Sequence, residues 1–208
     1  MVSAAETYEA FNAHSNLVDR GFARIASNMY CREVSTSLVH VLKLQALKGG
    51  AYVPCWGVSL GFMPHTWKPK AKFHPSIKGS RLDLFERPKP IKRSKRELWE
   101  IGSISTLHGE QYMRETLHSM WLDYEATIMD WFSNVVDFER CLEVARMQAS
   151  SADCDYDTHF PSPKLVYPFL LAKLGRMDEA KIELTRYCAD HEDAQSFAEL
   201  ARVLCRAA

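Results

Sequence analysis

Long apolar runs are missing from this sequence. No stretch of its 208 residues approaches the roughly 20 apolar residues that a transmembrane helix requires. The first residues include Glu6, Glu9 and Asp19 and do not follow the basic and then apolar pattern of a secretory signal. We therefore expect a cytoplasmic protein without a membrane-embedded part.

Closely spaced cysteine pairs are missing as well. The chain has six cysteines and no C-x-x-C motif, and His65 and His74 add no spacing typical of a metal site. Most of the cysteines lie inside apolar patterns, where a free thiol in a reducing compartment behaves as a small core residue. We therefore expect core residues and no metal site at Cys31, Cys55, Cys141, Cys154, Cys188 and Cys205.

The strong catalytic signatures are absent too. The sequence contains no G-x-x-x-x-G-K-[ST], G-x-G-x-x-G, H-E-x-x-H or G-x-S-x-G motif. Asp153, Asp155 and Asp157 begin like a calcium loop, but Thr158 stands where a glycine is needed and Lys164 where a bidentate glutamate is needed. These absences favour a non-enzymatic protein without a cofactor.

Net charge is zero, but the charges are divided along the chain. Residues 1–96 hold 16 Lys and Arg against 6 Asp and Glu, whereas residues 97–208 hold 10 against 20. Between Lys68 and Arg96, eleven basic residues face only two acidic ones. Such a segment is a solvated loop, is neutralised by the acidic half of the chain, or is a surface for an anionic partner.

What the sequence has in good measure is apolar content, at 47% of residues, which is enough for a buried core in a chain of this length. Ser3-Ala-Ala-Glu6 has the pattern of a capping box and predicts a helix over 3–20. Three β-rich stretches follow at 22–34, 37–47 and 51–63. Next comes a loop-rich segment at 64–96 with five of the nine prolines, a strand-like alternation over 81–87, and another strand-like stretch at 97–103.

The rest of the chain has helical periodicity. A stripe with a 3.6-residue period runs through Met113, Leu117, Met120, Trp121, Tyr124, Ile128, Trp131 and Phe132. The pattern continues after a kink near Ser133 to about Gln148, and shorter helices are expected at 163–174, at 178–189 and near the C-terminus. We predict an α+β protein with an N-terminal helix, an antiparallel sheet of about four to six strands and a helical C-terminal region. Its predicted parts are a sheet domain at 1–105 and a helical region at 106–208 packed on it as one unit.

Gly49-Gly50 is a signal for a two-residue hairpin loop. If these glycines form the whole loop, paired residue numbers sum to 99, and His40 lies opposite Ser59 with Cys55 on the same face. This trio suggests a nucleophile and a base. The alternative, which we favour, is a hydrogen-bonded core pair beneath the first helix, where no substrate enters.

The basic segment is the strongest candidate for binding. Its candidate contact residues are Trp67, Lys68, Lys70, Lys72, Lys89, Lys92, Arg93, Lys95 and Arg96. Cations attract phosphate and exposed aromatic rings stack on bases, so a nucleic-acid-binding protein or hydrolase is one hypothesis. An acidic protein surface satisfies the same charges, and we favour this protein partner. If the partner uses the negative half of the chain instead, Asp153, Asp155 and Asp157 become the relevant residues, and the oligomeric state stays open.

Two resemblances add to these expectations. Residues 17–62, with LVDRGFARIASNMYCRE, LVHVLKLQALKGG and YVPCWGVSLGF, resemble the opening of a small bacterial family known as a domain of unknown function. That resemblance implies an α+β fold and, since members are regarded as immunity-like or defence-associated, a protein that neutralises a partner by electrostatic complementarity. Tyr167-Pro-Phe-Leu-Leu-Ala-Lys-Leu-Gly-Arg-Met-Asp-Glu-Ala180 resembles the turn of a tetratricopeptide repeat and implies one helical hairpin, with peptide binding as a further option.

Overall fold

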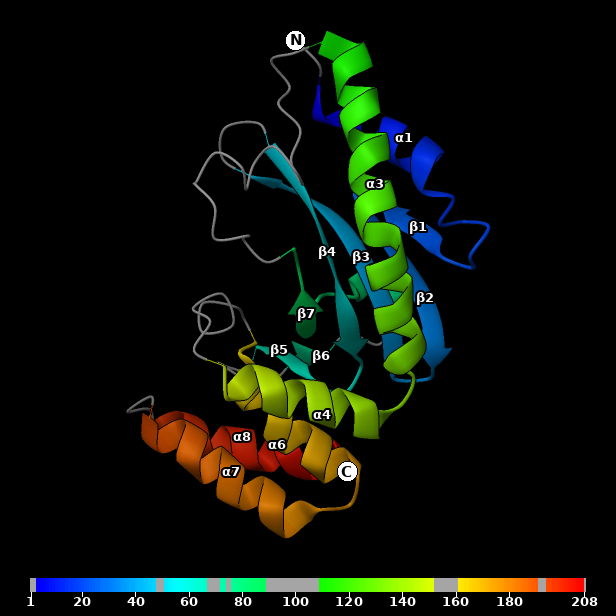
Figure 1. Cartoon of the computed structure of the whole chain (residues 1–208). Helices are drawn as coiled ribbons and strands as arrows, with labels where there is room; N and C mark the ends of the chain where they lie inside the picture. Colours follow the sequence, from blue (N-terminus) through cyan, green and yellow to red (C-terminus); the bar gives the residue numbers. More distant parts are fainter. Residues whose placement is uncertain are drawn as a thin grey trace. The chain divides into compact units, whose positions relative to one another are not determined.

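The sheet has five antiparallel strands in the order β1-β2-β3-β4-β7 (Figure 1). The computed structural model describes residues 3–47, 51–66, 72–73, 76–88, 109–151, 161–190 and 194–207. The strands of the sheet are β1 Ala23–Ala26, β2 Met29–Ser35, β3 Leu38–Leu47, β4 Ala51–Leu60 and β7 Leu84–Glu86. A separate antiparallel pair consists of β5 Pro64–Thr66 and β6 Lys72–Phe73, and a short 3-10 helix, η1, spans Ile77–Gly79. The predicted α+β class is confirmed.

The first helix, α1, spans Ala4–Ser15 and has the predicted capping box. The Glu6 amide donates to Ser3 Oγ at 3.2 Å, and the Ser3 amide donates to Glu6 Oε2 at 2.7 Å. The predicted end near residue 20 is wrong, because Asn16 takes the left-handed conformation at φ 48° and ends the helix earlier. Val18 consequently lies outside the helix and is exposed.

The expected two-residue loop between β3 and β4 is also wrong. Because β3 ends at Leu47 and β4 begins at Ala51, three residues separate the strands. At the far end of the pair, the Gly61 amide donates to the Ser37 carbonyl at 2.9 Å. Paired residue numbers in this antiparallel ladder therefore sum to 98 and not to 99.

Side-chain positions on the two strands agree with this register. Cys55 Sγ donates to Gln45 Oε1 at 3.1 Å, so these two residues lie on one face of the sheet. Leu44, Tyr52 and Trp56 belong to one buried cluster, so they share the other face. With paired numbers that sum to 99, His40 would lie opposite Ser59 on one face of the sheet. With the observed sum of 98, even-numbered residues of both strands share one face and odd-numbered residues share the other. His40 and Ser59 therefore lie on opposite faces.

The predicted helices of the C-terminal part are present. They are α3 Gly109–Asn134, α4 Phe138–Ala149, α6 Pro163–Lys173, α7 Met177–Asp190 and α8 Ala194–Ala207. The expected kink near Ser133 is a complete break, since Asp137 caps α4 by accepting a hydrogen bond from the Arg140 amide at 2.8 Å.

None of the helices in the described part of the chain is both long and apolar enough to cross a membrane.

The chain divides into two compact units, and the first consists of Met1–Arg32, His40–Gly57 and Phe85–Ser133. Its core packs α1 and α3 against strand residues, and Figure 1 shows α3 running alongside α1. Phe11 meets Trp121 edge to face at 5.7 Å between ring centres, and Phe22 meets Phe132 at 5.3 Å. Burying each such ring contributes roughly 1.5–3 kcal/mol.

The second unit consists of Glu33–Val39, Val58–Leu84 and Asn134–Ala208. Its helix α6 packs against α4, α7 and α8, and most of its side chains are fully buried. The expected domain boundary near residue 105 lies outside the described residues and stays a prediction.

The cysteines follow the core prediction with one exception. Four of them, Cys31, Cys55, Cys141 and Cys188, are buried. Cys205 is exposed in the last turn of α8, so the expectation of a core residue is wrong there. Cys154 lies outside the described residues.

Candidate functional site

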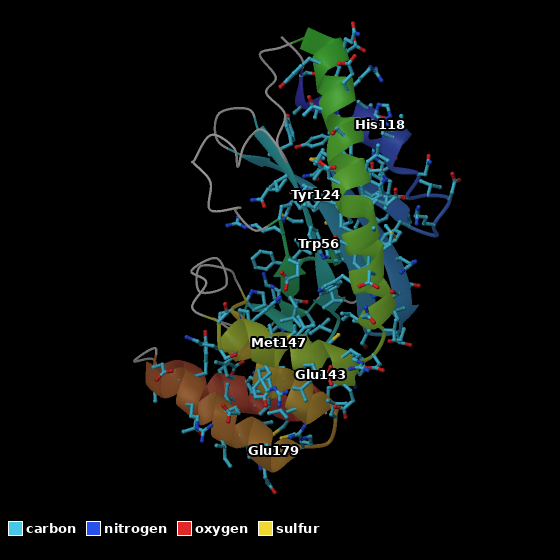
Figure 2. The ribbon with its side chains drawn as sticks, in the orientation of Figure 1. Trp56, His118, Tyr124, Glu143, Met147 and Glu179 are labelled. Carbon is cyan, nitrogen blue, oxygen red and sulfur yellow. The ribbon has the colours of Figure 1, made fainter. Side chains whose placement is uncertain are left out.

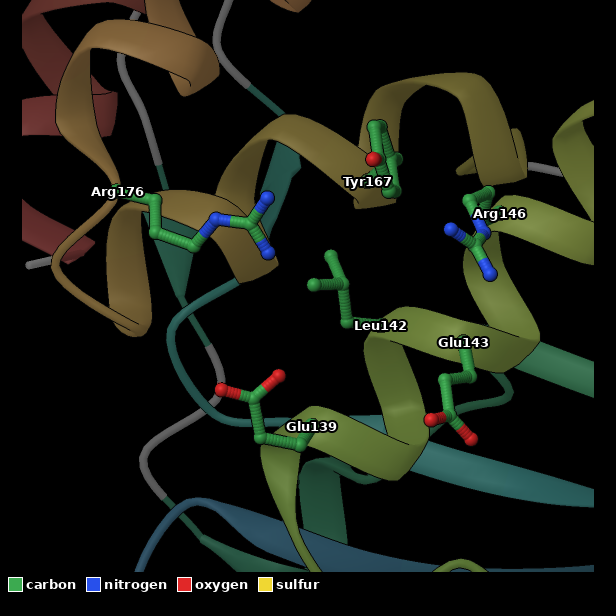
Figure 3. Close-up of a pocket in the computed structure, with 6 residues that line it drawn as sticks. All are labelled: Glu139, Leu142, Glu143, Arg146, Tyr167 and Arg176. Atoms are coloured by element: carbon green, nitrogen blue, oxygen red, sulfur yellow. The ribbon is translucent and has the colours of Figure 1, made fainter.

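A groove of about 180 Å³ lies in the second unit, between α4, α6 and the turn that leads into α7 (Figure 3). The residues that line it are Glu139, Leu142, Glu143, Arg146, Tyr167 and Arg176. The four lining residues on α4 are Glu139, Leu142, Glu143 and Arg146. They are spaced i, i+3, i+4 and i+7, and residues with this spacing share one face of a helix. The groove is therefore built from a polar stripe on α4 and from a hairpin that faces it.

The turn between α6 and α7 places Arg176 at the groove. Gly175 has a φ of +77°, which favours glycine. Its amide donates to Ala172 O at 3.0 Å, and the Arg176 amide donates to Leu171 O at 2.9 Å. This pair of hydrogen bonds is the Schellman ending of a helix, and it fixes the backbone from which the Arg176 side chain extends.

The charges in the groove differ in how they are paired. Arg176 donates to both carboxylate oxygens of Glu179 at 2.8 and 2.6 Å, and this hydrogen bonding raises the pKa of Arg176. Glu143 accepts from Arg140 at 2.8 Å. Arg146 and Glu139 form no ion pair with any residue that the structure describes. Arg146 is thus available to an anionic ligand, while the charge of Glu139 helps to raise the pKa of Arg176 without forming an ion pair.

Apolar surface lies between these charges. Figure 3 shows the Leu142 side chain at the centre of the groove, with Arg176 and Arg146 on opposite sides of it and Tyr167 across from it. Leu142 is only 6% exposed and forms the floor. A ligand that fits this arrangement has an apolar side chain beside charged ones.

Of the sequence-predicted contact residues, one lies in the described part of the chain. Lys72 lies exposed on the short strand β6. The other candidates lie outside the described residues, namely Trp67, Lys68, Lys70, Lys89, Lys92, Arg93, Lys95 and Arg96. The same holds for Asp153, Asp155 and Asp157.

His40 and Ser59 are both buried, as the favoured core interpretation expects, but the expected hydrogen bond between them is wrong, because they have separate surroundings. Arg32 Nη2 lies 3.1 Å from His40 Nδ1, and the His40 ring stacks on Phe132 at 4.6 Å between ring centres. Ser59 Oγ accepts a hydrogen bond from the Arg81 amide at 3.2 Å. The register places the two side chains on opposite faces, so they do not form a nucleophile and base pair.

A buried ion pair was not anticipated from the sequence. Asp83 is 1% exposed, and its Oδ1 accepts from Arg81 Nε at 2.6 Å while its Oδ2 accepts from the Leu60 amide at 2.7 Å. Arg81 Nη2 also donates to the Pro64 carbonyl at 2.8 Å. Burial raises the pKa of Asp83 to about 6, against the opposing effect of Arg81. The pair holds the end of β4 to the segment that follows it.

Comparisons with known proteins give no family for this chain. No family model, no curated protein and no solved structure matches it. Among the described residues, no group of three or more His, Cys, Asp or Glu is arranged to hold a metal ion.

Proposed function

We propose that this chain is a non-enzymatic binding protein whose groove between α4, α6 and α7 receives a segment of a partner protein. The observation that carries the proposal is the pair of charges at Arg146 and Glu139, which have no ion-pair partner in the described part of the chain. They flank the apolar floor at Leu142.

The groove favours an acidic and apolar segment as its occupant. The guanidinium of Arg146 has a planar set of donors that fits a carboxylate. An apolar side chain next to that carboxylate would cover Leu142 and the ring of Tyr167. Hydrogen-bonded charges fix the register of such a segment, while buried apolar surface supplies affinity.

More specifically, we propose an immunity-type or defence-associated bacterial protein that neutralises its partner. Support comes from the resemblance of residues 17–62 and from the charge division along the sequence. The helical hairpin of α6 and α7, over Pro163–Lys173 and Met177–Asp190, supports peptide binding, because paired helices of this kind present grooves to extended partners.

The experiment compares two charge reversals on exposed helix positions. Arg146→Glu changes the groove, and Arg186→Glu is the matched control on α7, where the arginine is paired with Glu183. A partner recovered from bacterial lysate with the wild-type chain is identified, purified and titrated against each variant. We expect about tenfold weaker binding for Arg146→Glu and an unchanged affinity for Arg186→Glu. Equal affinities for both variants would refute the proposal that the groove binds the partner.

The eleven basic residues between Lys68 and Arg96 favour nucleic acid as a second candidate partner. The test replaces Lys89, Lys92, Arg93, Lys95 and Arg96 by serine. Nucleic acid that copurifies with the wild-type chain and is lost from this variant would support the second candidate. Loss of a protein partner instead would assign the basic segment to the same protein interface as the groove.

A further inference from the structure

Two histidines from different helices meet in the first unit. His14 lies in the last turn of α1 and His118 lies on α3. Their ring centres are 5.4 Å apart, with 53° between the ring planes. Figure 2 marks His118 on the part of α3 that runs beside α1.

The His14 ring has a nitrogen without a hydrogen-bond partner in the part of the chain that the structure describes. This nitrogen, Nε2, is buried. A buried polar atom of this kind calls for a ligand, an ion or a water.

We propose that His14 and His118 together bind a divalent transition-metal ion of the zinc class. Two imidazoles on one tetrahedral ion, with metal–nitrogen distances of about 2.0–2.1 Å, place their ring centres about 5 Å apart. The separation of 5.4 Å matches this spacing. Imidazole nitrogen is a preferred ligand of zinc, copper and nickel, whereas calcium and magnesium prefer oxygen.

The surroundings set the character of the site. His118 is exposed, so water completes the coordination of the ion. Arg114 lies one turn before His118 and carries a charge that opposes a cation, but Glu110 accepts two hydrogen bonds from it at 3.0 and 2.8 Å. A bound ion would join α1 to α3 and would therefore stabilise the first unit.

The test uses the full chain with Cys205→Ser, which removes an exposed thiol that would also bind metal. Zinc is titrated by calorimetry and by thermal unfolding, and bound copper is examined by electron paramagnetic resonance. We expect one ion per chain, a rise of about 5 °C in the unfolding midpoint at a hundredfold excess over Kd, and a copper spectrum with two nitrogen ligands.

Single variants assign the ligands. His118→Gln changes an exposed position and is expected to fold normally, and His14→Gln keeps a polar side chain of similar size. We expect each to weaken zinc binding at least tenfold, while His65→Gln leaves it unchanged. Two results would overturn the proposal that His14 and His118 bind a metal ion. One is an equal zinc affinity of the wild type and His118→Gln, and the other is the absence of saturable zinc binding by the wild type.

Discussion

Arg81 donates through Nε to Oδ1 of Asp83 at 2.6 Å, and the carboxylate that it meets is almost completely buried. The two residues stand two positions apart in the chain. The second oxygen of Asp83 accepts a hydrogen bond from the Leu60 amide, and Arg81 Nη2 donates to the Pro64 carbonyl, so the pair joins the end of β4 and the start of β5 to the segment before β7. Buried charges are costly to leave unpaired, and this pair is therefore a sensitive point for stability.

Asp83→Ala is expected to destabilise the chain by about 2 kcal/mol or more at pH 7. The substitution removes the carboxylate that accepts from the Leu60 amide and from Arg81 Nε, and an unsatisfied buried group costs about 1–3 kcal/mol. Urea unfolding measures the loss. Asp123→Ala, at an exposed position of α3, is the control and should change stability by less than about 0.5 kcal/mol. Equal effects of the two substitutions would show that the buried pair contributes nothing.

The stabilisation by Asp83 should depend on pH. Burial raises its pKa from 3.8 in the unfolded chain to about 6 in the folded chain, so the folded state binds the proton more tightly. The proton-linked part of its contribution is therefore full below pH 3.8 and is lost as the pH rises through about 6, while the hydrogen bonds from Leu60 and Arg81 still contribute at pH 7. Unfolding of the wild type and of Asp83→Ala across this range gives the difference directly. A difference that grows with rising pH would contradict the direction of the pKa shift.

Ser3→Ala should cost about 1 kcal/mol of unfolding free energy, because it removes the acceptor of the Glu6 amide at the start of α1. Ser3→Asp supplies another capping oxygen and should keep most of the stability. Chemical denaturation of the three proteins checks this order. If Ser3→Ala proves as stable as the wild type, the first turn of α1 does not contribute to the folding equilibrium.

Phe132→Ala should destabilise the chain by about 3–5 kcal/mol. Phe132 is fully buried and its ring contacts both Phe22 and His40, so truncation leaves a cavity in the core of the first unit. Phe132→Leu keeps most of the volume and should cost about half as much. Denaturation curves of both variants test the packing, and a cost below about 1 kcal/mol for the alanine variant would contradict it.

The sequence predicted the helices well, because their periodicity is local. The stripe from Met113 to Phe132 and the capping box at Ser3 both depend on neighbours within two turns. The end of α1 was missed because Asn16, and not the later Gly21, takes the left-handed conformation first. Both residues tolerate a positive φ, and the sequence alone does not say which one ends the helix.

The strand register and the site were harder to predict, since both depend on contacts between distant residues. The pair Gly49-Gly50 suggested a two-residue loop, but three residues separate β3 from β4, and the shift moves His40 and Ser59 to opposite faces. The spacing of Glu139, Leu142 and Arg146 is readable on α4, but only the folded hairpin of α6 and α7 turns that stripe into a groove. The contact residues of the basic segment stay a prediction.

The central claim is that the groove contacts a partner protein, and photo-crosslinking tests it most directly. The measurement places p-benzoylphenylalanine at position 167, where Tyr167 lines the groove, and at position 112, where Tyr112 is an exposed aromatic residue of the first unit. After irradiation in bacterial cells, the account predicts a covalent protein adduct at position 167 and none at position 112. Adducts of the same protein at both positions, or at position 112 alone, would contradict the groove as the binding surface.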